Sequence, residues 1–281
     1  MFYYKNWFSF CKILSMDSRV KCTVSESLKL PLGVHFIVLK HDVETNVPRA
    51  LKLAEIEHQY GINSTYYVQA YLLKDKNNIT ILKKMQDMGH EISYHYDVLD
   101  ANSGDYVKAE KDFAYWIDRF EKEGFHISTI CQHGNPIKKR IGYNSNRDFF
   151  RNSKIKSKYP DLVDIVVDYS RYAIDKYVYI SDAGYMWKHI TEPETNDFNK
   201  DALTIPIGNF RKLIRYVGER KCSIVLSTHP HRWERSKFKI QSKILIFKIL
   251  RSGARMFEKI PFAYSILSRF YFIAKKICSN H

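Results

Sequence analysis

Short apolar runs alternate with amphipathic stretches along most of the chain. Residues 34–39 are apolar apart from one histidine, rich in β-branched side chains and bounded by Pro31 and Gly33, so they predict a buried strand. Similar runs predict strands at 64–68, 91–95, 127–132, 162–167, 177–181 and 223–227. Apolar residues at the three-and-four spacing of an amphipathic helix occur over 2–14, 46–61, 77–89, 105–123 and 209–220.

The order of these elements predicts an α/β fold. Strands and helices alternate about seven times, which implies parallel strands joined by crossover helices and favours a barrel-like closure over an open sheet. We therefore expect an N-terminal helical segment (1–30), a distorted (β/α)7-type barrel domain (31–236) and a helical tail (237–281).

Titratable side chains follow the apolar strands at four places: Asp42 and Glu44 after the first, then His95, His133 and His229. Strand ends of a parallel barrel converge on one face, so these residues could share a pocket although they are far apart in sequence. A repeated His or Asp at this position favours a functional site.

A simpler interpretation of the first segment also stands. Asp42 could cap the helix that follows, and His41 could satisfy a backbone carbonyl. A single histidine is more often structural than functional, so only the repetition at several strand ends favours shared chemistry.

The strand-end segments resemble motifs of the polysaccharide deacetylase superfamily. The similarity covers residues 33–233 and rests on His41-Asp42-Val43-Glu44, Gly89-His90-Glu91-Ile92-Ser93-Tyr94-His95 and Val225-Leu226-Ser227-Thr228-His229. Members of this family hydrolyse N- or O-acetyl groups on chitin-like sugars and peptidoglycan with a divalent metal. The chain looks closest to a bacterial branch found among cell-surface polysaccharide genes, so the resemblance implies a deacetylase-type barrel and a carbohydrate substrate.

The resemblance also implies roles for individual residues. In the first motif either Asp42 is the catalytic base and Glu44 a metal ligand, or Asp42 is the ligand and His41 occupies the base position. His95 matches an imidazole ligand of the second motif, and His229 matches the general acid that protonates the leaving group.

One ligand of the family pattern is missing, because Leu99 stands where a second imidazole is expected. A zinc or similar ion needs about three protein ligands and an open position for water, so His133 or Asp97 would have to complete the set. We expect a divalent metal whose ligands come from Asp42, Glu44, His95 and His133.

Substrate contacts are expected from side chains near the motif loops. These are the ring-bearing or basic residues His41, Tyr94, Arg232 and Trp233. Aromatic rings could stack on a sugar, and Arg232 could bind a carboxylate or instead form a surface salt bridge.

Positive charge is concentrated in the tail. Residues 232–281 contain twelve Lys and Arg against two Glu, a net of +10 out of +15 for the chain. Apolar stretches among these charges predict basic amphipathic helices that bind an anionic membrane surface through residues 238–276, or a solvated helical face that closes the barrel. No nucleic-acid recognition module is visible, so no nucleic-acid partner is expected.

Cysteine spacing and the apolar runs bear on the compartment. The five cysteines form no Cys-x-x-Cys pair, which indicates neither a zinc ribbon nor a disulfide framework and fits a reducing compartment. Residues 1–11 carry Lys5 and lack a small-residue cleavage site, and the longest uncharged apolar run in the tail, 260–268, is too short to span a bilayer. We expect a cytoplasmic protein peripheral to the inner face of the membrane.

Two functional hypotheses follow from the sequence. The first is a metal-dependent carbohydrate deacetylase-like hydrolase in surface polysaccharide metabolism. The second is a non-catalytic protein of the same fold that binds a glycan or an assembly partner. Metal content distinguishes them, because only the first needs a bound ion.

Overall fold

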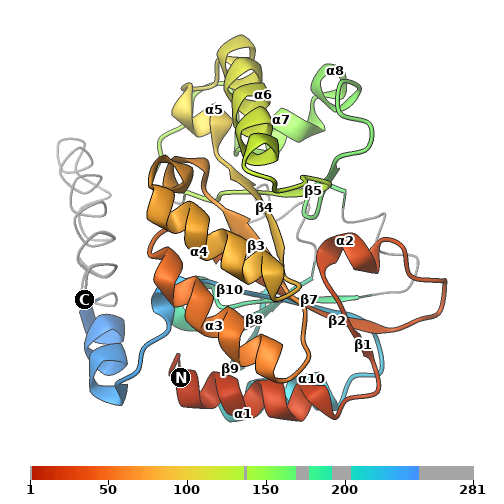
Figure 1. The fold of residues 1–281 in the computed structure, drawn as a ribbon, viewed down its shortest axis with the longest axis vertical. Helices are drawn as coiled ribbons and strands as arrows, with labels where there is room; N and C mark the ends of the chain where they lie inside the picture. The colour runs from red at the N-terminus through yellow and green to blue at the C-terminus, as the bar shows by residue number, and fades with distance from the viewer. Residues whose placement is uncertain (1, 136–137, 169–176, 192–203, 247–281) are drawn as a thin grey trace.

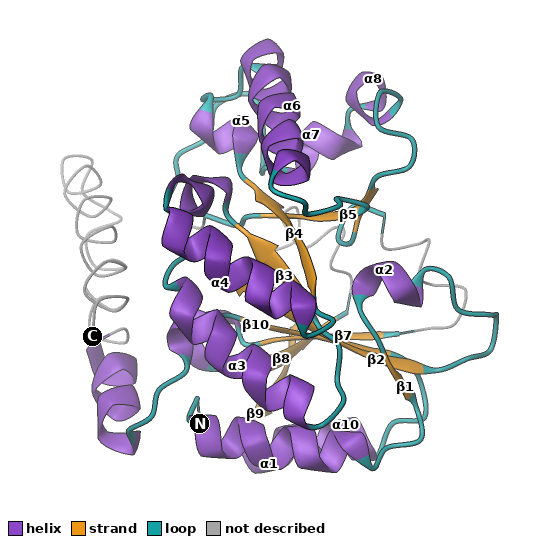
Figure 2. Cartoon of the chain, in the orientation of Figure 1, coloured by secondary structure: helices purple, strands orange, loops and turns teal. Residues whose placement is uncertain are grey.

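A sheet of ten strands lies at the centre of the molecule, with helices outside it (Figures 1 and 2). The computed structural model describes residues 2–135, 138–168, 177–191 and 204–246. The strands are β1 (Val20–Lys21), β2 (Phe36–Val43), β3 (Thr65–Val68), β4 (Glu91–Tyr96), β5 (Thr129–Gln132), β6 (Val163–Asp164), β7 (Val178–Ser181), β8 (Trp187–Ile190), β9 (Thr204–Gly208) and β10 (Ile224–Thr228).

The strand order is β6-β5-β4-β3-β2-β10-β7-β8-β9, with β1 beside β2. The pairs from β6 through β2 to β10 and β7 are parallel, whereas β8 and β9 extend the sheet by antiparallel pairing. The α/β class and the parallel strands expected from the sequence are confirmed. Within the described residues the sheet's two ends, β6 and β9, do not pair.

Helices connect the parallel strands and cover the outside of the sheet (Figure 2). They are α1 (Tyr4–Ser15), α2 (Val24–Ser27), α3 (Val47–Gln59), α4 (Lys76–Asp87), α5 (Val98–Ala101), α6 (Tyr106–Lys122), α7 (Arg147–Arg151), α8 (Ser153–Lys156) and α10 (Phe210–Gly218), with 3-10 turns η1 (Ala70–Lys74), η2 (Ala183–Tyr185) and η3 (Pro230–Arg232). The five helices predicted from amphipathic spacing correspond to α1, α3, α4, α6 and α10.

Every residue of β2 is buried, and successive side chains point to opposite sides. Phe36 and Val38 pack inside the sheet with residues of β3, β5, β7 and β10. Ile37 and Leu39 pack on the other side, in the apolar cluster that includes α1 and α10. The same alternation therefore directs Lys40 inward, and it decides which motif residues reach the interior.

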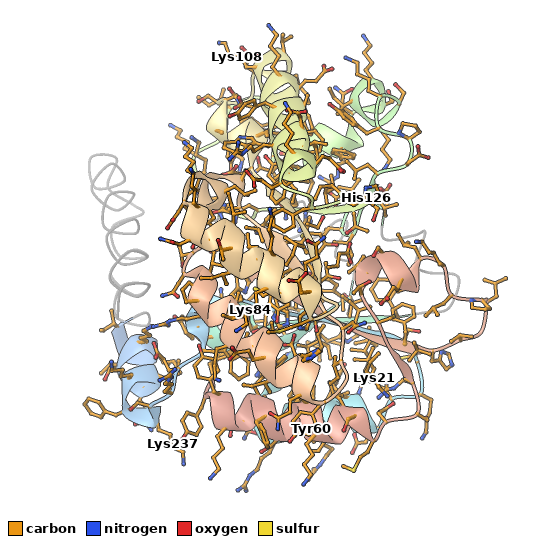
Figure 3. All side chains as sticks on the ribbon, in the orientation of Figure 1. Lys21, Tyr60, Lys84, Lys108, His126 and Lys237 are labelled. Atoms are coloured by element: carbon orange, nitrogen blue, oxygen red, sulfur yellow. The ribbon has the colours of Figure 1, made fainter. Side chains whose placement is uncertain are left out.

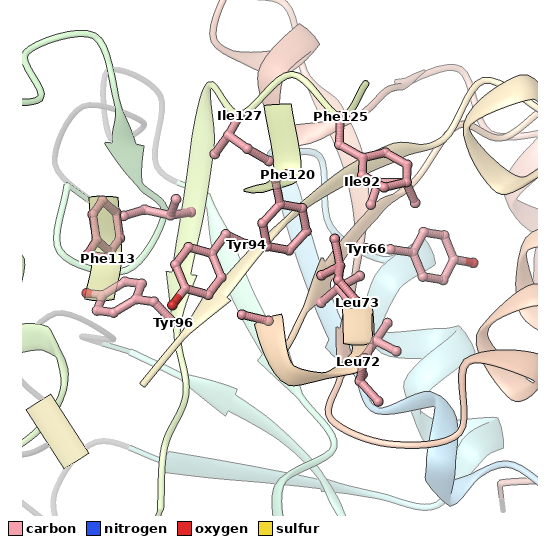
Figure 4. Packing of buried hydrophobic residues seen from close by; sticks show 14 of the residues in the cluster. Tyr66, Leu72, Leu73, Ile92, Tyr94, Tyr96, Phe113, Phe120, Phe125 and Ile127 are labelled. Carbon is pink, nitrogen blue, oxygen red and sulfur yellow. The ribbon is translucent and has the colours of Figure 1, made fainter. Parts of the chain in front are cut away.

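Aromatic side chains fill the space between β4 and α6 (Figure 4). The rings of Tyr94 and Phe120 lie 5.4 Å apart, and those of Tyr96 and Phe113 lie 5.8 Å apart edge to face. These contacts occupy the outer side of β4, so His95, between Tyr94 and Tyr96, points inward.

Local turns fix where α3 and β4 begin. Asn46 adopts a left-handed conformation (φ 51°, ψ 66°), and its side chain accepts a hydrogen bond from the Arg49 amide to cap α3. Gly89 (φ 90°) ends the turn after α4, and a Cβ there would lie 2.9 Å from Asn63 Oδ1. Both turns set the positions of strand ends that carry site residues.

Residues 237–246 form a further helix, and the remainder of the predicted tail, 247–281, lies outside the described residues. Among the helices that the structure describes, none is long and apolar enough to cross a membrane.

Candidate metal and acid-base site

Four strand ends bring carboxylates and imidazoles together inside the sheet. His133 Nδ1 lies 3.1 Å from Glu44 Oε1 and 3.3 Å from His95 Nε2. His229 Nε2 lies 3.6 Å from the same Glu44 oxygen and 3.9 Å from Asp42 Oδ2. The structure thus brings together all five titratable residues singled out at the predicted strand ends.

Glu44, His95 and His133 form a donor set that fits a divalent metal ion. One ligand atom from each lies within 4.8 Å of the others, and all three side chains are buried. His95 Nδ1 lies 3.0 Å from the Cys131 carbonyl, which fixes this nitrogen as a donor and leaves the Nε2 lone pair facing the cluster. Burial lowers the pKa of His95 to about 3, so its imidazole is neutral and able to bind a metal at neutral pH.

A second group with metal-ligand spacing, Asp42 with His95 and Cys131, fits an ion less well. Lys40 Nζ donates to both Asp42 carboxylate oxygens, at 2.6 and 2.8 Å. Burial raises the pKa of the Cys131 thiol, which keeps it protonated and a weak ligand. The donor set of Glu44, His95 and His133 is therefore the better candidate.

His133 is the second imidazole of the donor set. Leu99 is fully buried on α5 in the apolar cluster around α6, so it does not face the candidate site. An imidazole from the end of β5 thus supplies the nitrogen that the sequence position of Leu99 lacks.

Asp182, directly after β7, orients His229. Its carboxylate lies 2.6 Å from His229 Nδ1, and Arg232 Nη1 donates to the same oxygen at 2.6 Å. Thr228 Oγ1 donates to the other carboxylate oxygen, Asp182 Oδ2, at 2.7 Å. Burial opposes ionisation, but Arg232 and then His229 outweigh it and lower the pKa of Asp182. The ionised carboxylate holds a proton on Nδ1 and turns Nε2 toward Glu44 and Asp42.

Lys40 controls the charge of Asp42. Burial opposes ionisation of this carboxyl group as well, but the Lys40 ammonium beside it outweighs burial and lowers the pKa of Asp42 to about 2. Asp42 in turn raises the pKa of Lys40 despite complete burial, so both side chains stay charged near neutral pH.

A hydrogen-bond network anchors the loop that carries His133. Asn146 Nδ2 donates to the His133 carbonyl at 2.9 Å and to Asp100 Oδ2 at 3.0 Å. Arg140 donates hydrogen bonds from two nitrogens to the same Asp100 carboxylate, at 2.8 and 2.7 Å, and a third to the Asn135 carbonyl. The network ties this loop to α5 and fixes the backbone position of His133.

Three of the expected substrate-binding side chains lie away from the cluster. His41 points outward from β2, fully buried, with Nε2 2.9 Å from Glu57 Oε1. Tyr94 is 1% exposed in the aromatic cluster under α6. Trp233 is fully buried, and its Nε1 donates to Thr228 Oγ1. Arg232 lies beside the site, where it binds Asp182 and not open solvent.

Two residues of the site, Lys40 and Asp182, were missed by the sequence reasoning. Lys40 precedes Asp42 by two positions, so strand alternation places both on one side. Asp182 directly follows the predicted strand at 177–181, the same position that drew attention to the other strand ends. Both signals were present in the sequence.

Similarity to known proteins is found among solved structures. No protein-family model and no curated protein matches the sequence. Among solved structures, a family 4 carbohydrate esterase from Streptomyces lividans in complex with acetate is 12% identical, with a TM-score of 0.43 over 76% of this chain and 87% of that one.

The peptidoglycan deacetylase PdaC from Bacillus subtilis is also similar. It is 12% identical, with a TM-score of 0.36 over 82% of this chain and 100% of that one, and its D285S variant is 10% identical with a TM-score of 0.38 over the same shares. Because their TM-scores are below 0.5, the roles of residues rest on the geometry of the site.

Proposed function

We propose that this chain is a metal-dependent hydrolase that removes an acetyl group from a carbohydrate. The observation that carries the proposal is the adjacency of a three-ligand donor set, Glu44, His95 and His133, to an imidazole held by a carboxylate, His229 with Asp182. The motif resemblance supports the choice of acyl group and sugar substrate.

Glu44, His95 and His133 would hold the divalent ion, zinc or a similar metal. When bound, such an ion lowers the pKa of a coordinated water and polarises a carbonyl oxygen. The neutral His95 ring and the ionisable Glu44 carboxyl group suit this role, because nitrogen and oxygen donors together match the preference of zinc.

His229 is the residue best placed to move a proton. Its Nδ1 is held by Asp182, so Nε2 faces the cluster and can accept a proton from water and return it to the leaving group. Asp42 is a weaker base, since its pKa is about 2 and Lys40 occupies both of its oxygens. Its negative charge, 3.9 Å from His229 Nε2, instead favours the imidazolium that forms during the reaction.

Tyr71 offers an aromatic face for a sugar beside the cluster. Its ring is 47% exposed, and its hydroxyl donates to the Glu44 carbonyl at 2.5 Å. A sugar ring stacked on Tyr71 would lie near the donor set, which fits a carbohydrate acetyl group as the substrate.

Acetate release tests the proposal. Purified protein would be loaded with zinc, and acetate release from N- and O-acetylated sugars would be measured for the wild type and His133→Ala. We expect chelation or His133→Ala to lower the rate by at least about 100-fold. The matched control is His126→Ala (labelled in Figure 3), because the His126 side chain is 85% exposed and precedes the start of β5, whereas His133 follows its end.

Two outcomes would count against the proposal. Equal acetate release by wild type and His133→Ala would place the chemistry elsewhere. A metal-loaded wild type that binds sugars but releases no acetate would favour the non-catalytic glycan-binding protein.

A further inference from the structure

The helix at residues 237–246 is fixed to the body by one of its faces. Ile240 is 2% exposed and packs in the cluster that includes α1 and α10, and Ile244 packs against the same cluster. Lys243 forms an ion pair with the buried carboxylate of Glu234, which also binds Arg49 at 2.8 Å. These contacts determine which side of the helix faces outward.

The outward side carries large apolar side chains. Phe238 is 76% exposed, Leu245 is 60% exposed and Ile246 is 44% exposed. Phe238 and Leu245 are seven positions apart, about two helical turns, so they lie on the same face. Among the described residues, the packing of the inward face does not require apolar side chains at these positions.

Basic side chains flank the exposed apolar residues. Arg235, Lys237 and Lys239 are all exposed, and Lys237 projects from the helix at the periphery of the molecule (Figures 1 and 3). The sequence from Arg232 to His281 continues this composition, with a net charge of +10. This arrangement fits the surface of an anionic bilayer. The apolar strip can reach the acyl chains, while the Lys and Arg side chains beside it contact the anionic headgroups.

We propose that residues 235–246 bind the surface of an anionic membrane. Phe238 and Leu245 enter the boundary between headgroups and acyl chains, and Lys237, Lys239 and Arg235 contact the anionic headgroups. A polyanion such as RNA would use the charges but leave Phe238 and Leu245 without a role, so a lipid surface fits the arrangement better. The inference does not depend on the proposed hydrolase activity.

Sedimentation of the full chain with vesicles tests this proposal. Vesicles of phosphatidylcholine alone and of phosphatidylcholine with phosphatidylserine would be compared, at low and high salt. We expect binding to the anionic vesicles only, weakened by salt, because salt screens the attraction between the basic side chains and the anionic headgroups.

Two variants separate the apolar from the charged contribution. We expect Phe238→Ser with Leu245→Ser to lower the vesicle-bound fraction about tenfold or more, since both side chains are exposed and their loss leaves the fold intact. The matched control is Ile141→Ser with Ile205→Ser, which are 80% and 49% exposed elsewhere on the surface and should bind as the wild type. Lys237→Gln with Lys239→Gln should weaken binding and its salt dependence.

The proposal would be overturned by three results. These are absence of binding to anionic vesicles, wild-type binding by the variant lacking Phe238 and Leu245, and binding to single-stranded RNA without binding to vesicles. The last would assign the charges to a nucleic-acid partner.

Discussion

Asp182 accepts hydrogen bonds from Thr228, His229 and Arg232, so one buried carboxylate sets the direction of the imidazole that faces the metal ligands. Its position after β7 also explains why Arg232 is ordered beside the site. Arg232 balances the charge of Asp182, which would otherwise be costly to bury.

Replacing Asp182 tests this orienting role. We expect Asp182→Asn to bind zinc like the wild type but to release acetate about 100-fold more slowly, because His229 loses the partner that fixes its proton on Nδ1. Metal content and steady-state rates measured on the same samples would show the separation. Asp148→Asn, which removes an ion pair with Arg151 at 2.9 Å, is the matched control. An unchanged rate in Asp182→Asn would contradict the assignment of His229.

The residues expected to lie together were predicted correctly where strand alternation alone decides which side of the sheet a side chain faces. Asp42, Glu44, His95, His133 and His229 could be placed together from the rule that parallel strand ends share an edge. The exclusion of His41 and Tyr94 could have followed from the same alternation, since each neighbours an inward-facing residue. Spacing places Lys40 and Asp42 on one side of β2, but the two hydrogen bonds from Lys40 to the carboxylate depend on side-chain conformations that spacing does not give.

At the level of elements, α3 begins at Val47, three residues after Glu44, and Asn46 forms the turn that joins them. Asn46 combines a left-handed backbone with the cap on the Arg49 amide, at 3.2 Å. Few residue types satisfy both requirements.

We expect Asn46→Ala to lower the free energy of unfolding by about 2 kcal/mol, because it loses the cap and keeps an unfavourable positive φ. Asn46→Gly should cost less than about 1 kcal/mol, since glycine adopts the left-handed region freely. Urea unfolding of the two variants gives the comparison. If Asn46→Gly were as destabilised as Asn46→Ala, the backbone conformation would not be the cause.

A buried carboxylate on α3 links this helix to α1 and to two strands. Glu57 accepts hydrogen bonds from Trp7 Nε1 at 2.8 Å and from the Tyr66 hydroxyl at 2.7 Å, and it lies 2.9 Å from His41 Nε2. Burial opposes its ionisation, but His41 and the hydrogen bonds outweigh burial and lower the pKa of Glu57. The network explains why α1 packs on the strand that carries Asp42.

The pKa of Glu57 predicts a dependence of stability on pH. Because the folded value is below the ordinary value of about 4, the contribution is present above that pH and is lost as pH falls through the folded value. We expect Glu57→Gln to be less stable than the wild type by about 3 kcal/mol at pH 7, with a smaller gap at pH 3. Urea unfolding at both values tests this, with Glu121→Gln as an exposed control. A gap that does not shrink in acid would contradict an ionised Glu57.

The sequence pattern did not predict two strands, β8 and β9. β8 contains Lys188 and His189 between two buried residues, and β9 contains Pro206, so neither has the continuous apolar run of a central strand. Their pairing is antiparallel and lies at the end of the sheet, where one side is open to polar residues. Long-range pairing, not local sequence, stabilises these strands.

For the molecule as a whole, the sheet brings strand ends from residues 42 to 229 to one interior site, while the helix at 237–246 lies on the periphery. The α/β class, the parallel strands and the identity of the clustered residues could be predicted from strand ends. The sequence left the completing ligand open between His133 and Asp97, because the choice depends on the path of the loop held by Asp100 and Asn146.

The direct test of the account is the position of a bound metal. Crystals of the protein grown with zinc would be measured at the zinc absorption edge. We predict an anomalous peak bonded to a Glu44 carboxylate oxygen, His95 Nε2 and His133 Nδ1, with Lys40 still hydrogen-bonded to Asp42 and His229 Nε2 facing the ion. No peak between Glu44, His95 and His133, or a peak on Asp42 and Cys131 with Lys40 displaced, would contradict it.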